Sequence, residues 1–282
     1  MIDKRISKLY NLIKDWLKKR SKQHRMNTPI RISSLADYIN QIDEIADSGE
    51  DYLYRGQENA AWRITSSAYR RLLVGQPDAE QGFLADLFVG YLRQIIDEIQ
   101  LRYPSTYKDM SPLECMAHLQ HNKVATGLID FTFSPLVALW LACDNQENAD
   151  GKVFVIDNNK EKIEEITTKD KLQQELDEFF DADQAQWHLW APTLDSLAID
   201  TKRMTMQQSV FLFGLSEVDT EMVVQEIIIP QAHKEGLRTA LAKLGITEKT
   251  LFSDLIGFFE RNTHAHPYDL ILAEPYYGEN QR

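Results

Sequence analysis

An arginine at the end of an apolar run is the first side chain that could do chemistry. Arg55 closes the aromatic-rich stretch Tyr52–Gly56, which has the length and composition of a strand. Burying a guanidinium there is costly unless a carboxylate or an anionic ligand pairs with it. Gly56 permits close approach of the backbone, which suits a ligand with phosphates. Two interpretations stay open: a ligand contact and an internal ion pair with Asp130.

A second group of polar residues lies on an apolar strand that leads into an apolar helix. Asp130 and Thr132 belong to this strand, and the helix begins at Pro135. The free N–H groups at a helix N-terminus attract phosphate, so the three features together favour an anion site. His121, just upstream, is either a hydrogen-bond partner for a ribose hydroxyl or a structural histidine.

A third group comes from the late strands. Gln207 precedes and Gln208 begins a strand expected near residues 208–213, and Glu226 lies in a strand expected near 223–230. Alternation along the first strand places Gln207, rather than Gln208, on its aromatic face. A glutamate can stabilise positive charge during glycosidic cleavage, which a glutamine cannot do as an anion. We expect Gln207→Ala to reduce function more than Glu226→Ala, and keep both residues as candidates.

Other site classes find little support in the sequence. It has no glycine-rich dinucleotide turn, no phosphate loop and no HExxH motif. His264 and His266 are interpreted as surface histidines, so no metal is expected. Cys115 and Cys143 are too few for a disulfide framework, which favours a cytoplasmic protein with reduced thiols.

Four stretches of the sequence resemble the motifs of the FRG domain family, which is named for a Phe-Arg-Gly signature. They are Tyr54–Gln57 with Trp62–Arg70, Leu119–His121 with Thr126–Trp140, Arg203–Phe211, and Leu251–Leu255. The likeness covers about residues 30–260, and tyrosine replaces the phenylalanine of the signature. Gly127 and Ser209 depart from the pattern, because the family usually has arginine and glycine there.

A more distant resemblance, to ADP-ribosyltransferase folds, implies a mechanism. Those folds carry an arginine on the first core strand, a polar strand leading into a buried helix, and then a Glu or Gln strand. The resemblance implies that NAD+ is the substrate and that a pyrophosphate binds to the arginine. The implied cofactor-binding residues are Tyr54, Arg55, Gly56, Gln57, Thr126, Asp130 and Thr132. The implied catalytic residues are His121, Gln207, Gln208 and Glu226.

These resemblances lead to three functional hypotheses. The first is NAD+-dependent ADP-ribosyl transfer to a macromolecular acceptor, or NAD+ cleavage, by a bacterial toxin or phage-defence effector. The second is a non-catalytic module that senses a nucleotide or a phage component. The third is a scaffold that recruits a partner.

The elements expected around these residues are short strands scattered among helices. This order favours an α+β fold with a mixed or split antiparallel sheet and an ADP-ribosyltransferase-like core. Strands are expected at 52–56, 128–132, 151–156, 208–213 and 223–230. Helices are expected at 2–22, from Ser33 or Ser34 to about residue 47, and at 80–102, 112–121, 136–143, 160–190, 233–244 and 248–261. No stretch reaches the roughly 20 apolar residues of a membrane span, and the N-terminus lacks the features of a secretory signal.

Charge divides the 282-residue chain into a basic segment and an acidic body. The net charge is −12, yet residues 1–26 hold nine Lys and Arg against Asp3 and Asp15. An acidic body disfavours general binding to a nucleic-acid backbone. Residues 1–26 are expected to form a basic amphipathic helix, followed by an FRG domain over 30–282 with a C-terminal helical extension. The helix either docks an anionic partner or packs on the acidic body.

The basic segment is expected to be dispensable for folding, because the body contains every expected strand. Deleting residues 1–26 should leave a cooperative melting transition within a few degrees of that of the intact chain. Loss of soluble protein would show instead that the apolar face of this helix completes the core.

Overall fold

A computed structural model gives the fold. It describes residues 28–46, 51–76, 81–144, 148–158, 162–180, 187–192, 202–215, 217–218 and 220–262. The basic helix expected over residues 2–22, and His264 with His266, lie outside the described residues.

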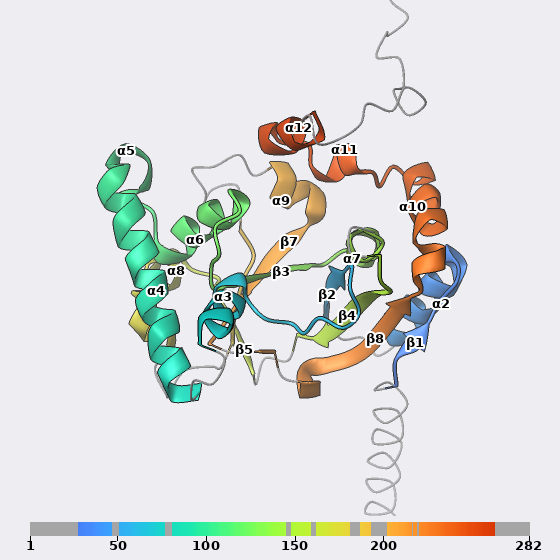
Figure 1. Cartoon of the computed structure of the whole chain (residues 1–282), viewed down its shortest axis with the longest axis horizontal. Coiled ribbons are helices and arrows are strands. Elements are labelled where there is room, and N and C mark those ends of the chain that lie inside the picture. Colours follow the sequence, from blue (N-terminus) through green and yellow to red (C-terminus); the bar gives the residue numbers. More distant parts are fainter. Residues whose placement is uncertain are drawn as a thin grey trace, which may run out of the picture.

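The described strands form one mixed sheet of eight strands (Figure 1). The strands are β1 (Ile30–Arg31), β2 (Tyr52–Gln57), β3 (Leu128–Thr132), β4 (Gly151–Asp157), β5 (Ile163–Glu165), β6 (Trp187–Trp190), β7 (Ser209–Phe213) and β8 (Val223–Ile229). Their order is β1-β8-β4-β2-β3-β7-β6-β5. The β1–β8 and β5–β6 pairs are parallel and the others antiparallel. The expected α+β fold with a mixed sheet is confirmed.

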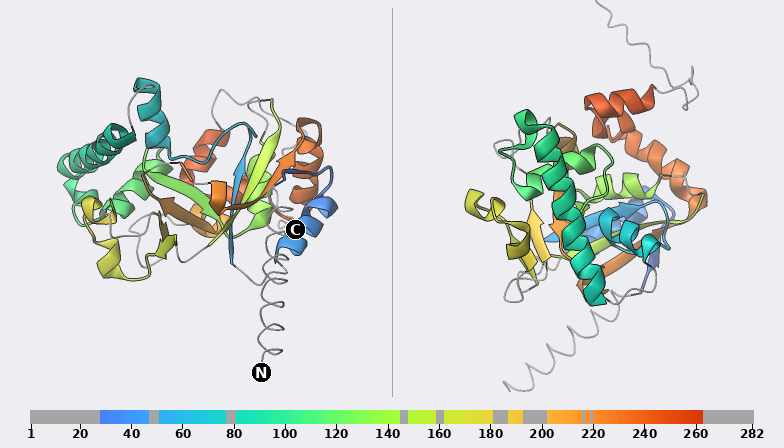
Figure 2. Two further views of the ribbon diagram at one scale, coloured as in Figure 1. Left: turned by 90° about the horizontal axis from the view of Figure 1, so that it is seen from below. Right: turned by 60° about the vertical axis from the view of Figure 1, so that its left-hand side comes forward.

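Helices occupy the segments between these strands. They are α2 (Leu35–Ala46), α3 (Ser67–Gly75), α4 (Gln81–Arg102), α5 (Pro104–Tyr107), α6 (Pro112–His121), α7 (Pro135–Ala142), α8 (Lys169–Leu172), α9 (Lys202–Gln207), α10 (Lys234–Lys243), α11 (Glu248–Leu251) and α12 (Leu255–Arg261). Short 3-10 turns occur at Leu176–Phe180, Thr220–Met222 and Gln231–His233. Figure 2 shows α4 along one end of the sheet and α2 with α10 at the other.

Local sequence explains where the two helices beside the predicted site begin. Ser111 accepts the backbone N–H of Glu114, whose side chain accepts the N–H of Ser111, so a complete capping box starts α6. Ser134 accepts the N–H of Val137 and starts α7 in the same way. Both helices carry proline at the first position, where its missing N–H costs nothing.

Two helical expectations were wrong. Residues 160–190 were expected to be helical, but they contain β5, the single turn α8, a 3-10 turn and β6. All four residues of β6 are buried, and β6 pairs with β5 on one side and β7 on the other. This tertiary environment outweighs the helical propensity of the charged stretch before β6. The helix expected over 248–261 is divided in two, because Asp254 accepts the N–H of Gly257 and begins α12 as a separate helix.

The sheet is split between its two central strands. β2 pairs with β4 over six consecutive residues, whereas β2 and β3 share one register pair, Tyr54 with Thr132. Beyond this pair the strands diverge (Figure 1). Next to this pair, the sides of β2 and β3 that face each other are not paired, although each strand still pairs with its other neighbour. Arg55 lies at this split.

Helix α7 is buried against the half of the sheet that contains β2 and β4. Val137, Ala138, Leu139 and Trp140 are buried on it, as its uniformly apolar sequence predicts. It approaches β2 so closely that a Cβ atom on Gly56 would lie 1.9 Å from the carbonyl oxygen of Ala138. The glycine is therefore required by helix packing, and it also lines the cleft described below.

Burial of the two cysteines gives an expected chemical result. Both side chains are fully buried, and burial raises the pKa of Cys115 to about 11 and that of Cys143 to about 12. The reactive species is the thiolate, so neither thiol should react with an aromatic disulfide reagent at pH 8 in the folded protein. Both should react within seconds in denaturant. Rapid labelling of either thiol under native conditions would contradict the packing of α6 or α7.

No helix among the described residues is long and apolar enough to cross a membrane.

Candidate functional site

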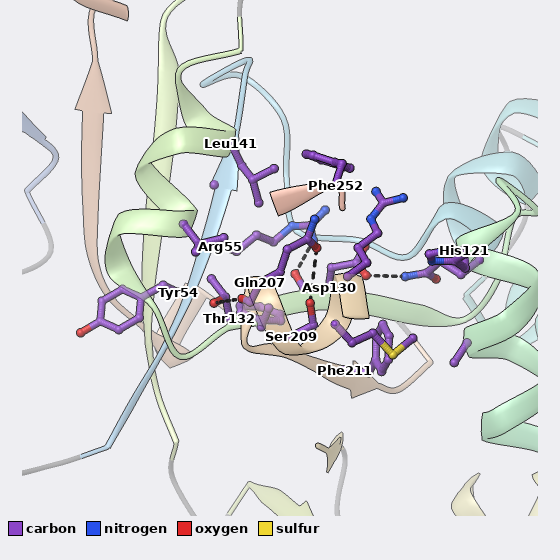
Figure 3. Close-up of a pocket in the computed structure, with 17 residues that line it drawn as sticks. Tyr54, Arg55, His121, Asp130, Thr132, Leu141, Gln207, Ser209, Phe211 and Phe252 are labelled. Carbon is purple, nitrogen blue, oxygen red and sulfur yellow. Dashed lines mark hydrogen bonds between the residues drawn. The ribbon is translucent and has the colours of Figure 1, made fainter. Parts of the chain in front are cut away.

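A cleft of about 250 Å³ opens where β2 and β3 diverge (Figure 3). Arg55 extends from β2 across this gap, and its Nη1 donates a hydrogen bond to the backbone oxygen of Asp130 at 2.5 Å. The guanidinium thus replaces the strand-to-strand bond that the split removes. The expected Arg55–Asp130 contact is present, but it is made with the carbonyl and not with the carboxylate.

The surroundings of Arg55 hold its side chain in place. The side chain of Gln57 is buried beside Arg55. In the amide orientation that gives both its oxygen and its nitrogen a partner, the oxygen accepts from Nε of Arg55 at 3.2 Å. Burial lowers the pKa of Arg55, the Asp130 carboxylate opposes this shift, and Arg70 adds to it. A guanidinium remains protonated in spite of such shifts. Gln57 therefore positions the arginine and does not line the cleft.

Two further arginines border the same region. Arg70 on α3 donates from Nη1 to the backbone oxygen of Thr65 at 2.6 Å. Arg203 on α9 lines the cleft, with its guanidinium carbon 4.3 Å from the centre of the Phe252 ring. Within the described residues, Nη2 of Arg55, Nε and Nη2 of Arg70 and every N–H of Arg203 have no hydrogen-bond acceptor. Arg55 and Arg203 therefore offer unused donors to the cleft, and Arg70 lies in the hollow that adjoins it.

The Asp130 carboxylate is solvent-exposed and is held by a neighbouring helix. Its Oδ1 accepts from Nε2 of Gln120 at 2.8 Å, and the oxygen of the same amide accepts from the Thr126 hydroxyl. Thr126 itself is fully buried and orients Gln120 from behind. Gln120 was not among the predicted site residues, although it lies within the Leu119–His121 motif, where its position beside His121 was the available signal.

His121 borders the cleft but is engaged by a buried carboxylate. Its Nε2 lies 2.6 Å from Oδ2 of Asp254, a residue that is 2% exposed. Asp254 also starts α12, so the pair joins α6 to the C-terminal helices. This geometry favours the structural interpretation of His121, and Asp254 was missed even though it lies in the Leu251–Leu255 stretch.

Gln207 lines the cleft from the end of α9. Its backbone oxygen accepts from the Thr132 hydroxyl at 2.6 Å, and its Nε2 donates to the Leu251 oxygen at 3.1 Å. Its Oε1 accepts from the Ser209 hydroxyl at 3.4 Å. The amide thus connects α9, β7 and α11. The expected strand alternation does not apply here, because the chain is helical up to Gln207.

Gln208 and Glu226 lie elsewhere. Gln208 is an exposed turn residue with φ of +47°, and it reverses the chain between α9 and β7. Glu226 lies on β8, which β4 and β2 separate from β3, and its Oε1 accepts from Nζ of Lys152 at 3.1 Å. Both residues are absent from the lining of the Arg55 cleft, which Tyr54, His121, Asp130, Thr132 and Gln207 share.

Gly127 is packed tightly in the core. A Cβ atom there would lie 2.8 Å from the Phe213 ring and 2.9 Å from the Leu92 side chain. An arginine at this position would have no space in the present core.

No cluster of three or more potential metal ligands occurs among the residues that the structure describes.

Among the comparisons with known proteins, a family model gives a match. No curated protein and no solved structure gives a significant match to the chain. The family model of the FRG domain matches residues 50–151, from the start of β2 through α7 to the first residue of β4. The match includes Arg55, Arg70, Gln120 and Asp130, whereas α9 to α12 lie beyond it. The chain therefore contains an FRG domain, and the divergence of β2 and β3 inside that domain forms one side of the cleft.

Proposed function

We propose that this FRG domain binds a phosphate-bearing nucleotide in the Arg55 cleft. The observation that carries the proposal is the pair of arginines with unused donors, Arg55 and Arg203, that lines the cleft in a chain of net charge −12. Arginine donors arranged in this way suit phosphate, which accepts several charge-assisted hydrogen bonds at once. Asp130 is the one carboxylate among the residues that line the cleft, so the local charge is positive.

The size and lining of the cleft suit the ring and sugar of a nucleotide. Ligand pockets commonly measure about 300–1,000 Å³, so about 250 Å³ accommodates a ring with its sugar but not a whole dinucleotide. Val137, Leu141, Phe211 and Phe252 supply an apolar wall for a flat ring. NAD+ is the first ligand to test, since the sequence resemblance to ADP-ribosyltransferase folds implies it.

NAD+ cleavage or ADP-ribosyl transfer is a second candidate function, supported by the position of Asp130. Its exposed carboxylate lies beside the arginine that would hold the phosphates, and an anion there can stabilise positive charge on a ribose as its glycosidic bond breaks. Such an activity would suit the bacterial toxin or phage-defence effector suggested above. Binding without turnover would suit a nucleotide-sensing module.

Incubation with NAD+ labelled separately in its nicotinamide and its adenine distinguishes these functions. Free nicotinamide with adenine label on macromolecules of a bacterial extract would support transfer, and free nicotinamide alone would support cleavage. Asp130→Asn keeps an oxygen for Gln120 but removes the charge, so it should abolish turnover while binding persists. Unchanged turnover in this variant would refute the catalytic role of the carboxylate.

A further inference from the structure

A second hollow, of about 260 Å³, adjoins the Arg55 cleft. Arg55, Gln120 and Asp130 line both, so the two hollows meet at the Arg55–Asp130 contact. The walls that belong to the second hollow alone come from α3 with the loop before it, from the segment between α6 and β3, and from the start of β3. Among them, Arg70 and Lys123 are positively charged.

The two hollows differ in chemistry. The first has the apolar wall and Arg203, whereas the second has no aromatic side chain in its lining and combines Arg70 and Lys123 with the hydroxyl of Ser67. Asp130 is again the one carboxylate in its lining. A ligand that filled both would therefore have a ring at one end and negative charge at the other.

One nitrogen of the Arg70 guanidinium, Nη1, is held by hydrogen bonds to Thr65. Nη1 donates to the oxygen of Thr65 at 2.6 Å and lies 3.4 Å from the hydroxyl of the same residue. This contact fixes the guanidinium at the start of α3. Its Nε and Nη2 make no hydrogen bond to any described residue. A fixed, planar donor pair is well suited to bind a phosphoryl group.

We propose that the two hollows form one binding site divided by Arg55, and that its ligand carries a pyrophosphate. In this site Arg55 contacts the phosphoryl group nearer the sugar, and Arg70 with Lys123 holds the second one. The ligand class is accordingly a nucleoside diphosphate or a dinucleotide and not a nucleoside monophosphate. This inference rests on the proposed nucleotide binding and specifies its ligand.

Titrations with adenosine monophosphate and adenosine diphosphate test the inference on the full chain. The intact protein should bind the diphosphate at least about tenfold more tightly, which is the effect of one charge-assisted contact. Arg70→Gln should remove this preference by weakening the diphosphate to about the affinity of the monophosphate. Arg71→Gln is the matched control, because Arg71 is the next residue on α3, contacts Tyr91 and lines neither hollow.

Two further comparisons separate a ligand contact from a structural role. Arg70→Lys keeps the charge and should retain part of the diphosphate preference, and the melting temperatures of all variants report folding. Equal affinities of the intact protein for both nucleotides, or equal weakening of both by Arg70→Gln, would overturn the pyrophosphate assignment. If either of these two results is found but nucleotide binding still requires Arg55, the pyrophosphate assignment fails and the proposed nucleotide binding stands. Absence of binding to either nucleotide or to NAD+ would overturn both.

Discussion

Replacing Gly56 by alanine should destabilise the fold strongly, because the added methyl group meets the backbone of α7. The new Cβ would lie 1.9 Å from the backbone oxygen of Ala138 and 2.8 Å from the backbone nitrogen of Ala142. Backbone atoms of a buried helix cannot rotate away as a side chain does, so α7 or β2 must shift. We expect a cost at or above the upper end of the roughly 1–3 kcal/mol typical of overpacking.

Chemical denaturation of Gly56→Ala beside Gly90→Ala measures this cost. Gly90 lies on the exposed face of α4 with no atom within 4 Å of an added Cβ, so its replacement should raise stability by about 0.5–1 kcal/mol. Equal stability of the two variants would show that α7 does not pack on β2 as described.

Replacing Arg55 by lysine should weaken nucleotide binding by about 10- to 100-fold, the effect of losing one or two charge-assisted hydrogen bonds. Lysine keeps the charge but cannot contact the Asp130 carbonyl, the Gln57 amide and a phosphate together. Stability should fall by about 1–2 kcal/mol, because hydrogen bonds are lost at the split in the sheet.

Melting curves with and without NAD+ separate the two effects of this substitution. The intact protein should gain stability from the ligand, and Arg55→Lys should gain much less. Arg31→Lys is the control, since Arg31 lies on β1 at the edge of the sheet and forms an exposed ion pair with Asp150. Full stabilisation of the Arg55 variant by NAD+ would mean that the arginine serves the fold alone.

Most elements of the fold could be predicted because their signals are local. The Ser111 and Ser134 caps, the apolar run of α7 and the short apolar run of β4 are each read from fewer than about twelve neighbouring residues. The single residue pair between β2 and β3 has no such signal. This pairing depends on how α7 packs against the strands. The same packing explains why position 56 holds a glycine, since α7 leaves no space for a Cβ atom there.

The candidate site could be predicted in part for the same reason. Arg55 and Asp130 stood out as polar residues in apolar strands, and the structure brings them together. Gln120 and Asp254 were missed, since an amide and a carboxylate beside ordinary helix residues acquire their roles only from partners distant in sequence. Glu226 attracted attention by residue type, but the strand order places it two strands away from the cleft.

A calorimetric titration of NAD+ into the intact protein at two salt concentrations tests the central claim most directly. Binding to a cluster of arginines should saturate at one ligand per chain. Its affinity should fall between about 50 and 200 mM salt, because mobile ions screen exposed charges. Absence of saturable binding up to millimolar NAD+, or an affinity that does not change with salt, would contradict the assignment of the Arg55 cleft as a phosphate-binding nucleotide site.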